Sequence, residues 1–441
     1  MQFAARGRKP RVFCGHMPAV RRLSGCEKCP VGGYGARWEP FSAPLVFQGL
    51  PPVKLALVTE TYPPEINGVA MTLSHLVAGL VARGHGVQVI RPRQKGEKDV
   101  NETRFSDDDG ASHWLVPGMA IPMYKSLRLG LPVAPTLQRH WRTEPPHVVH
   151  VATEGPLGLA ALYSAAKCGL PVTSSFHTNF HQYGGHYGLK VGQDVALRYL
   201  RWFHNRTRCT MVPTDEMLRL LAADGFQRLH VLARGVDTRL FSPSKRSDAL
   251  RRAWGAAPKD PVVIYVGRMA AEKNLGLAVE AFLRVQEFEP GARFVLVGDG
   301  PEREALAAKY PHFHYAGTRR GDELAAFYAS ADVFVFPSTT ETFGNVITEA
   351  MASGLVVLSY DYAAARQFIR DGENGYSAPF NDRPAFLTRA EAVFRHRAAW
   401  SDIRAAARAT AETITWGAII DRFESELAAA CAVVKPVASG V

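Results

Sequence analysis

The chain has 441 residues and a mass of 48.3 kDa, with 47% hydrophobic and 21% charged residues. This length and composition predict two or three globular domains and exclude a disordered, collagen-like or small disulfide-stapled protein. The formal net charge is +11. Residues 1–50 carry eight basic and two acidic side chains, a balance of +6 that leaves only +5 for the rest of the chain. A nucleic-acid-binding protein, which needs a strongly basic folded region, is therefore disfavoured.

Residues 1–52 predict a flexible basic extension, because they lack hydrophobic periodicity and are interrupted by Gly and Pro. A zinc site built on the Cys26-x-x-Cys29 pair with Cys14 and His16 is disfavoured, since nothing around it resembles a folded knuckle. A transit peptide would need more serine. A third hypothesis is that translation starts at Val53, so that this segment is absent from the native protein.

The rest of the sequence favours a cytoplasmic protein without a membrane span. Cys168, Cys209 and Cys431 are isolated, which favours a reducing compartment. No run approaches the roughly 18–20 apolar residues that cross a bilayer. We therefore expect a cytoplasmic enzyme, with peripheral attachment to the inner face of the cell membrane as an option.

From residue 53 onward, short β-branched runs alternate with helical patterns. This alternation predicts parallel sheets covered by helices on both faces. The first half contains predicted strands at 54–60, 87–92, 148–153, 172–177, 209–213 and 229–233, and predicted helices at 69–83, 156–167, 190–206 and 215–224. The second half contains predicted strands at 262–267, 293–297, 313–316, 333–337 and 356–360, and predicted helices at 274–288, 301–309, 321–330, 344–353, 383–397 and 400–411.

Two doubly wound domains follow from this repetition, with a polar, proline-marked break near 238–260. We assign residues 53–237 to an N-terminal domain and 238–415 to a C-terminal domain. Residues 416–441 form a final helix that returns toward the first domain, and a tail. Open α/β sheets bind ligands at the carboxyl ends of their strands, so the expected active site is the cleft between the two sheets.

The most informative stretch runs from Phe334 to Gly354 and reads FVFPSTTETFGNVITEAMASG. A strand ends, a loop presents Glu341, and the next helix carries Glu349 in its first turns. The backbone amides of Phe343, Gly344 and Asn345 then lie at a helix N-terminus, which favours phosphate. The two carboxylates flank this point as acceptors for hydroxyls. The plain alternative is a pair of solvated glutamates at a helix end.

Two further loops supply ligand-binding groups at strand ends. VVIYVGRMAAEK places Arg268 and Lys273 after a strand, where two cations suit an anionic ligand. Asn67 and Gly68 follow another strand and open a helix, and Gly68 lets a ligand approach the backbone. Solvated cations and an ordinary turn glycine are the competing interpretations. A dinucleotide fingerprint is disfavoured, because Arg303 stands where the third glycine would be.

In order and spacing, these motifs resemble the retaining glycosyltransferases of family 4, which have the GT-B fold, and the resemblance covers roughly residues 53–432. It implies that Glu341 contacts the transferred sugar, that Glu349 binds the ribose, and that Arg268 and Lys273 hold the donor pyrophosphate. The glycine loop at Gly68 would lie under the donor. The similar groups are bacterial GDP-mannose-dependent mannosyltransferases and UDP-sugar-dependent lipid glycosyltransferases.

Two other residues enter through the same resemblance, which also makes residues 53–237 the acceptor-side domain and 238–415 the nucleotide-sugar domain. His177, in SSFHTNF, matches a histidine that contacts the donor sugar, although a lone strand-end histidine is usually structural. Arg234, in ARGVD, lies in a segment that resembles the family's interdomain segment and is assigned to the acceptor side. Glu154 is interpreted from its position, at a strand end before a proline-started helix, as an acceptor-side or loop-ordering residue. The sequence departs from many relatives at residues 363–365, where three alanines replace a glycine pair, which leaves the donor preference open.

No metal or other cofactor is expected. The Asp-x-Asp spacing that other glycosyltransferases use for a divalent cation occurs at Asp107–Asp109, in a polar loop that we interpret as solvent-facing. No carboxylate is convincingly placed as a double-displacement nucleophile. The resemblance therefore implies front-face transfer of a hexose from a GDP- or UDP-sugar to a hydroxyl acceptor, in which the leaving phosphate takes the acceptor's proton.

The acceptor is expected to be a glycolipid or a cell-envelope glycan. Residues 190–208 combine basic and aromatic side chains, which suits an anionic membrane surface, although a helix packed on its own sheet explains the pattern equally well. A GT-B-like epimerase or hydrolase acting on a sugar nucleotide is the alternative activity. Donor base, sugar, linkage and oligomeric state stay open.

Overall fold

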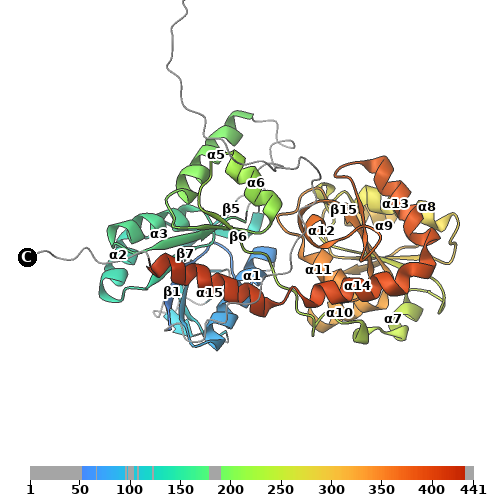
Figure 1. Ribbon diagram of the computed structural model, residues 1–441, viewed down its shortest axis with the longest axis horizontal. Coiled ribbons are helices and arrows are strands. Elements are labelled where there is room, and N and C mark those ends of the chain that lie inside the picture. Colours follow the sequence, from blue (N-terminus) through green and yellow to red (C-terminus); the bar gives the residue numbers. More distant parts are fainter. Residues whose placement is uncertain are drawn as a thin grey trace, which may run out of the picture. The chain divides into compact units, whose positions relative to one another are not determined.

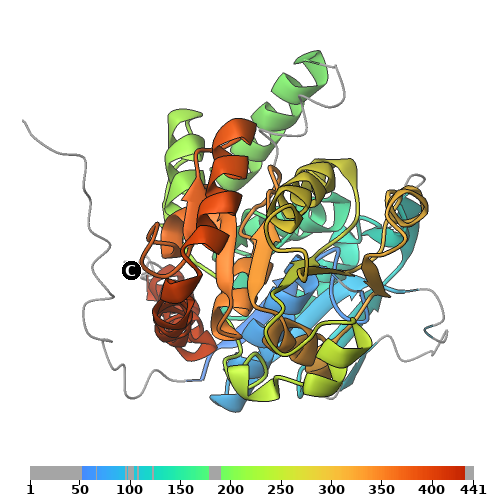
Figure 2. The ribbon, with the colours of Figure 1, turned by 90° about the vertical axis from the view of Figure 1, so that its right-hand side faces the viewer.

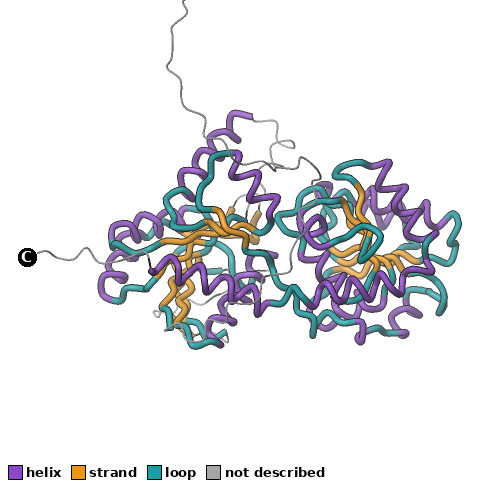
Figure 3. The backbone as a smooth tube through the Cα atoms, viewed as in Figure 1, coloured by secondary structure: helices purple, strands orange, loops and turns teal. Residues whose placement is uncertain are grey.

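The computed structural model describes residues 52–65, 67–94, 97, 104–106, 109–121, 124–177 and 190–432. The basic extension, its candidate zinc ligands Cys14, His16, Cys26 and Cys29, and the start-site hypothesis lie outside the described residues. Figure 1 labels the elements, and Figure 3 shows the strands in two groups, each flanked by helices.

The first sheet has eight strands in the order β10-β9-β8-β7-β1-β2-β4-β3. All neighbouring strands pair in parallel except β3, which runs antiparallel to β4 at the edge. The strands are β1 (Lys54–Val58), β2 (Gly86–Pro92), β3 (Arg104–Ser106), β4 (Ser112–Val116), β7 (Val148–Val151), β8 (Val172–Ser175), β9 (Thr210–Val212) and β10 (Leu229–Val231).

The helices of this half connect the parallel strands, as a parallel sheet requires. They are α1 (Gly68–Ala82), α2 (Ala134–Thr143), α3 (Pro156–Lys167), α5 (Lys190–His204) and α6 (Asp215–Ala223). A separate antiparallel ribbon consists of β5 (Gly118–Ile121) and β6 (Tyr124–Gly130).

The second sheet has six parallel strands in the order β13-β12-β11-β14-β15-β16. Figure 2 shows this sheet with helices on either side. Its strands are β11 (Val262–Val266), β12 (Arg293–Val297), β13 (His314–Gly317), β14 (Val333–Phe336), β15 (Val356–Tyr360) and β16 (Tyr376–Ala378). Its helices are α7 (Asp248–Ala253), α8 (Leu275–Gln286), α9 (Arg303–Lys309), α10 (Gly321–Ser330), α11 (Asn345–Ala352), α12 (Ala363–Phe368), α13 (Arg383–Arg395) and α14 (Trp400–Glu412), with 3-10 turns η1 (Pro243–Lys245), η2 (Ala271–Lys273) and η3 (Arg397–Ala399).

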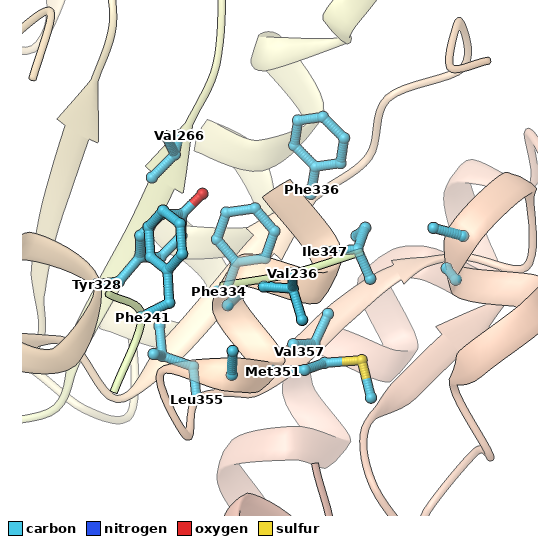
Figure 4. Close-up of a cluster of buried hydrophobic side chains, with 14 of the residues drawn as sticks. Val236, Phe241, Val266, Tyr328, Phe334, Phe336, Ile347, Met351, Leu355 and Val357 are labelled. Carbon is cyan, nitrogen blue, oxygen red and sulfur yellow. The ribbon is translucent and has the colours of Figure 1, made fainter. Parts of the chain in front are cut away.

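The core of the second half fixes β14 and α11, which lie on either side of the Glu341 loop. Phe334 and Phe336 of β14 and Ile347 and Met351 of α11 are all buried, and Figure 4 shows them in one apolar cluster. Burying such side chains contributes about 1.5–3 kcal/mol each. The loop between these elements is therefore held at both ends by tightly anchored structure.

The last helix, α15 (Trp416–Ala432), packs against α1 of the first half, as Figure 1 shows. Trp416 stacks on His75 with the ring centroids 4.4 Å apart. The contact is close at Gly79, where a Cβ atom, if present, would lie 2.1 Å from Ile420 Cδ1. A larger residue at position 79 would therefore force the Ile420 side chain to move and disturb the packing of α15 on α1.

The α/β fold class is confirmed, while residues 104–143 contain structure that the sequence interpretation left out. Here lie β3, β4 and the β5–β6 ribbon, followed by α2, which buries only Leu137, His140 and Trp141. Strands of three to five residues, such as β3, β4 and β5, and a helix with so few buried side chains give little periodic signal. The later elements β16, α7 and α12 are also short and were likewise omitted.

The interpretation of Asp109 as solvent-facing is wrong. Its carboxylate accepts hydrogen bonds from the Tyr62 hydroxyl at 2.6 Å and the Ala111 amide at 2.9 Å, and it contacts His113 Nε2 at 3.1 Å. Burial acts to raise the pKa of Asp109, but these contacts outweigh it and lower the pKa. The residue fastens a loop to β1 and β4, and its partners are all protein groups.

Candidate active site

Two motifs that are distant in sequence meet at the carboxyl edge of the second sheet. Lys273 closes η2 after β11, and Glu341 lies in the loop after β14. Lys273 Nζ donates to Glu341 Oε1 at 2.6 Å and to the Thr340 carbonyl at 3.3 Å. Both side chains are mostly buried, at 18% and 17% exposed. A partly desolvated ion pair of this kind fixes both charged groups in position.

The Glu341 loop has further supports. The Ser338 hydroxyl donates to Glu341 Oε1 at 2.8 Å, and the Tyr362 hydroxyl donates to the Glu341 carbonyl at 2.6 Å. Neither Ser338 nor Tyr362 was singled out from the sequence, because a serine or tyrosine in a loop has no distinctive pattern. Together these bonds orient the carboxylate and the backbone of Glu341.

The N-terminus of α11 lies beside this carboxylate. Gly344 precedes the helix with φ = 93°, a left-handed conformation that glycine adopts without strain. Amides at a helix N-terminus and the helix dipole favour an anion at this end. The ring of Phe343 is only 1% exposed and packs inside the protein, so its side chain supports the loop from below.

Glu349 lies one turn further into α11, where it accepts a hydrogen bond from the Tyr328 hydroxyl at 3.1 Å. Burial raises its pKa to about 7, partly offset by the Tyr328 bond. The structure therefore gives Glu349 a hydrogen-bond partner at Oε2. The side chain of Arg268, in contrast, is 54% exposed, and its Nη1 contacts Glu272 Oε1 at 3.4 Å.

The glycine loop of the first half reaches the same region. A Cβ on Gly68 would lie 3.1 Å from Arg234 Nη1 and 3.8 Å from Asn345 Nδ2. Asn67 caps α1, because its Oδ1 accepts from the amides of Val69 at 3.0 Å and Ala70 at 2.8 Å. The side chain of Asn67 therefore shapes the loop, and Gly68 is the residue that keeps the space beside Arg234 open.

Arg234 is a buried cation with few partners. It is 5% exposed, its Nη1 donates to Asn345 Oδ1 at a long 3.4 Å, and its guanidinium lies 5.7 Å from the centre of the Phe343 ring. Its Nη2 is buried without a hydrogen-bond partner. Burial lowers the pKa of Arg234 to about 10, with Glu341 acting in the opposite direction. Within the described residues, no carboxylate forms an ion pair with it.

His177 follows β8. Like Arg234 Nη2, both of its ring nitrogens are buried without a hydrogen-bond partner. Burial lowers its pKa well below the ordinary histidine value, and the charges of Arg234, His150 and His204 add to this. The imidazole is therefore neutral at physiological pH. Buried polar groups without partners are rare in folded proteins, so such groups commonly mark a ligand site.

Glu154, assigned to the acceptor side from the sequence, is tied to the protein. Its Oε1 contacts His204 Nε2 at 3.0 Å, and its carbonyl accepts from the Tyr199 hydroxyl at 2.6 Å. These contacts join the end of β7 to α5. An acceptor-side role for Glu154 stays a prediction.

Glu60 is a buried acid that the sequence interpretation missed. It follows β1, it is 8% exposed, and it accepts hydrogen bonds from the amides of Leu157 at 3.0 Å and Gly130. Burial raises its pKa to about 7, while the backbone hydrogen bonds lower it. Its position at the end of a predicted strand was the available signal. Glu60 joins the start of α3 to the β5–β6 ribbon.

Two doubly wound parallel sheets with these groups at their strand ends define a glycosyltransferase of the GT-B fold. Solved structures agree on the fold. Sucrose-phosphate synthase from Thermosynechococcus elongatus superposes with a TM-score of 0.70 at 17% identity, over 86% of this chain and 99% of that one. Anabaena HepE in complex with UDP and glucose gives 0.66 at 17% identity, over 86% and 99%.

Sequence comparison identifies the family. Residues 66–240 match the model of Glycosyltransferase Family 4, and residues 260–396 match that of glycosyl transferases group 1. A GDP-mannose-dependent alpha-mannosyltransferase of Mycobacterium tuberculosis is 34% identical over 75% of this chain and 85% of its own length. An alpha-monoglucosyldiacylglycerol synthase of Acholeplasma laidlawii is 31% identical over 73% and 84%. The chain belongs to glycosyltransferase family 4, and it is a hexosyltransferase that uses a nucleotide-sugar donor.

Proposed function

We propose that the enzyme transfers a hexose, with retention of anomeric configuration, from GDP-mannose to a hydroxyl group of a lipid or envelope-glycan acceptor. The observation that carries this proposal is the contact between Lys273 and Glu341 beside the α11 N-terminus. It puts a cation, helix amides and a carboxylate acceptor within reach of one diphosphate-linked sugar. Three similar proteins named GDP-mannose-dependent alpha-mannosyltransferases, at 34%, 35% and 30% identity, support the choice of donor over a UDP-hexose.

In this proposal the donor diphosphate lies between Arg268, Lys273 and the first amides of α11. Glu349 accepts from the ribose hydroxyls, and Glu341 accepts from hydroxyls of the sugar. Gly68 leaves room for the donor on its other side. Lys273 then exchanges part of its contact with Glu341 for the phosphate, which releases a carboxylate oxygen for the sugar.

Arg234 and His177 complete the donor site. The buried guanidinium has a free Nη2 and stands close to Gly68 and Asn345, so it is better placed for the diphosphate or the sugar than for the acceptor. A neutral His177 donates one hydrogen bond and accepts another, which suits a sugar hydroxyl. This assignment revises the acceptor-side role that the sequence suggested for Arg234.

The reaction proceeds by front-face transfer. The bond between the sugar C1 and the phosphate oxygen breaks, and the departing oxygen takes the proton of the acceptor hydroxyl. The acceptor oxygen then bonds to C1 on the same face. Fixed cations at the leaving diphosphate stabilise the developing charge, an effect worth about 3–4 kcal/mol for one well-placed donor. Among the described residues no cluster of three or more His, Cys, Asp or Glu could hold a metal ion, and the proposal uses none.

A lipid acceptor is supported by the similarity to alpha-monoglucosyldiacylglycerol synthases and by the basic, aromatic helix α5. Within the described residues, no helix combines the length and apolarity needed to cross a bilayer. We propose that the enzyme binds peripherally to the inner face of the cell membrane.

A donor panel tests the proposal. Thermal unfolding is followed with GDP-mannose, UDP-glucose and ADP-glucose, because a ligand that binds the folded state raises the melting temperature. Incubation with GDP-mannose and a lipid extract is followed by NMR of the product's anomeric proton. We expect a shift with GDP-mannose and an α-linked product. A shift of the melting temperature with UDP-glucose alone would show that the donor is a UDP-hexose and not GDP-mannose. A product with inverted anomeric configuration would reject the front-face mechanism. Free sugar without a lipid product would favour the hydrolase alternative.

A further inference from the structure

A second concave site lies in the helical layer of the first half, formed by α2, α3, α5 and the segments next to them. Its volume is about 740 Å³, within the range of about 300–1,000 Å³ that small-molecule sites occupy. The walls are almost entirely apolar. They include Leu159, Leu162 and Tyr163 of α3, Ala134 of α2 and Trp202 of α5.

Large apolar side chains of this groove are open to solvent. Leu159 is 36% exposed, Trp202 is 43% exposed and Tyr163 is 54% exposed. Single exposed apolar residues are common, but several grouped around one concave surface typically mark a binding site. Among the described residues, contacts leave much of these three side chains uncovered, so the groove favours an apolar ligand.

Both charged residues that line the groove are basic. The guanidinium of Arg206 lies 4.1 Å from the centre of the Trp202 ring, and Arg208 is fastened by a hydrogen bond to the Ala430 carbonyl. Lys167 adds a third cation, with its Nζ 5.6 Å from the centre of the Tyr163 ring. An apolar wall with cations at its rim matches an amphiphile with an anionic head and a hydrocarbon tail.

The groove also points toward the active-site side of the sheet. It includes Pro156, the first residue of α3, and extends along that helix to Ala166, a length of about 15 Å at the α-helical rise. Pro156 follows Glu154, which contacts His204 at the carboxyl edge of the first sheet, where His177 also lies. The groove therefore extends from the carboxyl edge of the first sheet, at Pro156, toward the amino edge, where the Arg208 amide donates to the Val172 carbonyl at the start of β8.

We propose that this groove binds the hydrocarbon chain of an anionic membrane lipid, with the lipid headgroup at the rim cations near the amino edge of the first sheet. The inference rests on the proposed function, in which the enzyme binds peripherally to a membrane. The basic segment 1–50 is a poor occupant, because its balance of +6 is repelled by the rim cations. A flat membrane surface cannot enter a concave site, whereas a hydrocarbon chain can lie along its apolar wall.

The test uses dodecyl phosphate below its critical micelle concentration, with ethyl phosphate as the headgroup without the chain. Calorimetry should detect binding of dodecyl phosphate and little binding of ethyl phosphate. L159D places a charge on the groove wall and should weaken dodecyl phosphate binding at least about tenfold, because burying an unpaired carboxylate is unfavourable. L220D is the matched control, since Leu220 is also exposed, at 44%, but lies on α6 away from the groove. W202S provides a second groove variant.

The outcomes separate this inference from the proposed function. Absence of dodecyl phosphate binding, equal binding of ethyl phosphate, or equal weakening by L159D and L220D would overturn the groove assignment. If GDP-mannose transfer to lipid fails while the groove variants selectively lose dodecyl phosphate, the proposed acceptor is wrong and the lipid site stands. If transfer succeeds, L159D should raise the lipid concentration required and leave the KM for GDP-mannose unchanged.

Discussion

The two sheets contribute differently to the donor site. On the second sheet, Lys273 and Glu341 are paired at 2.6 Å, and Ser338 and Tyr362 brace the same loop. The groups from the first sheet, Arg234 and His177, have buried nitrogens with no hydrogen-bond partner. Among the described residues, the groups of the second sheet are hydrogen-bonded to the protein, whereas buried nitrogens of Arg234 and His177 have no hydrogen-bond partner, which is the state expected of groups that await a ligand.

The paired Lys273 and the unpaired Arg234 illustrate two different roles of a charged side chain. A paired cation contributes to the position of its loop and to function, so its loss affects both. An unpaired buried cation destabilises the fold and is retained because it acts on a ligand. Variants on the two sides should therefore move stability and activity in different combinations.

The largest effect is expected from K273A. It removes a cation facing the leaving diphosphate and should lower kcat about 10²–10³-fold. It also deprives Glu341 of its ion-pair partner, so the melting temperature should fall as well. Steady-state kinetics with GDP-mannose and thermal unfolding measure the two effects.

The control for K273A is K309A, because Lys309 is exposed on α9 and distant in sequence from the motifs. It should leave both kcat and the melting temperature nearly unchanged. Normal turnover by K273A would remove Lys273 from the catalytic machinery.

R234M should differ from K273A, because it should lower activity but raise stability. Loss of the guanidinium should reduce kcat/KM by about 10²-fold, by analogy with other transition-state charge contacts. Replacing an unpaired buried cation by an apolar side chain of similar length should raise the free energy of unfolding by about 1–2 kcal/mol. Denaturant unfolding without a ligand measures the stability change.

R234K sharpens the same comparison, because it keeps the charge but loses the planar guanidinium and its several donors. Activity between those of R234M and the unmodified enzyme would support direct contact with the donor. A loss of stability in R234M comparable to that in K273A would show that Arg234 is a structural residue.

Glu349 should contribute a pH-dependent term to stability. Its pKa is about 7 in the folded protein against 4.5 for an ordinary glutamate, so the folded state holds the proton more tightly. Its stabilising contribution is complete below pH 4.5 and declines as the pH rises to about 7. E349Q cannot lose this proton and should gain about 1–2 kcal/mol relative to the unmodified protein above pH 7.

Chemical denaturation across this pH range measures the difference between the two proteins. Glu60, whose pKa is also raised to about 7, contributes to both curves and cancels in the difference. A difference curve that is flat with pH would mean that Glu349 is ionised in the folded state.

The smallest effect concerns Ala363, which has φ = 52° at the start of α12. An alanine in the left-handed region is strained by about 1 kcal/mol, and glycine is not. A363G should therefore raise stability by about that amount. A365G, in the same helix with ordinary backbone geometry, should lower it. Thermal unfolding of the pair distinguishes relief of strain from a general effect of glycine.

Much of the architecture could be predicted because it depends on local periodicity. The predicted helices at 156–167 and 321–330 coincide with α3 and α10. Lys273 and Glu341 each follow a predicted strand, and strands of one parallel sheet end at a common edge, which is where the structure has the two side chains in contact. What failed was the region of β3 to β6 and α2, where β3, β4 and β5 are only three to five residues long and α2 buries only three side chains, so the periodic signal is weak.

The hydrogen-bond and ion-pair partners of individual side chains could not be predicted from the sequence. The sequence indicates that Arg268, Lys273 and Arg234 are cations near a site, but their exposure differs from 54% to 18% to 5%. Which of them finds a carboxylate depends on rotamers and on the loops that approach from elsewhere. Glu60 and Asp109 show the same limit, because their partners lie on other elements.

The contact of Gly79 with Ile420 has a consequence for how this gene can vary. A residue in the first helix accommodates one that is encoded more than 300 codons later. Exchanging the N-terminal half for that of a relative would therefore separate two surfaces shaped for each other. Chimeras should therefore take α1 and α15 from the same parent, although these helices are encoded near opposite ends of the gene.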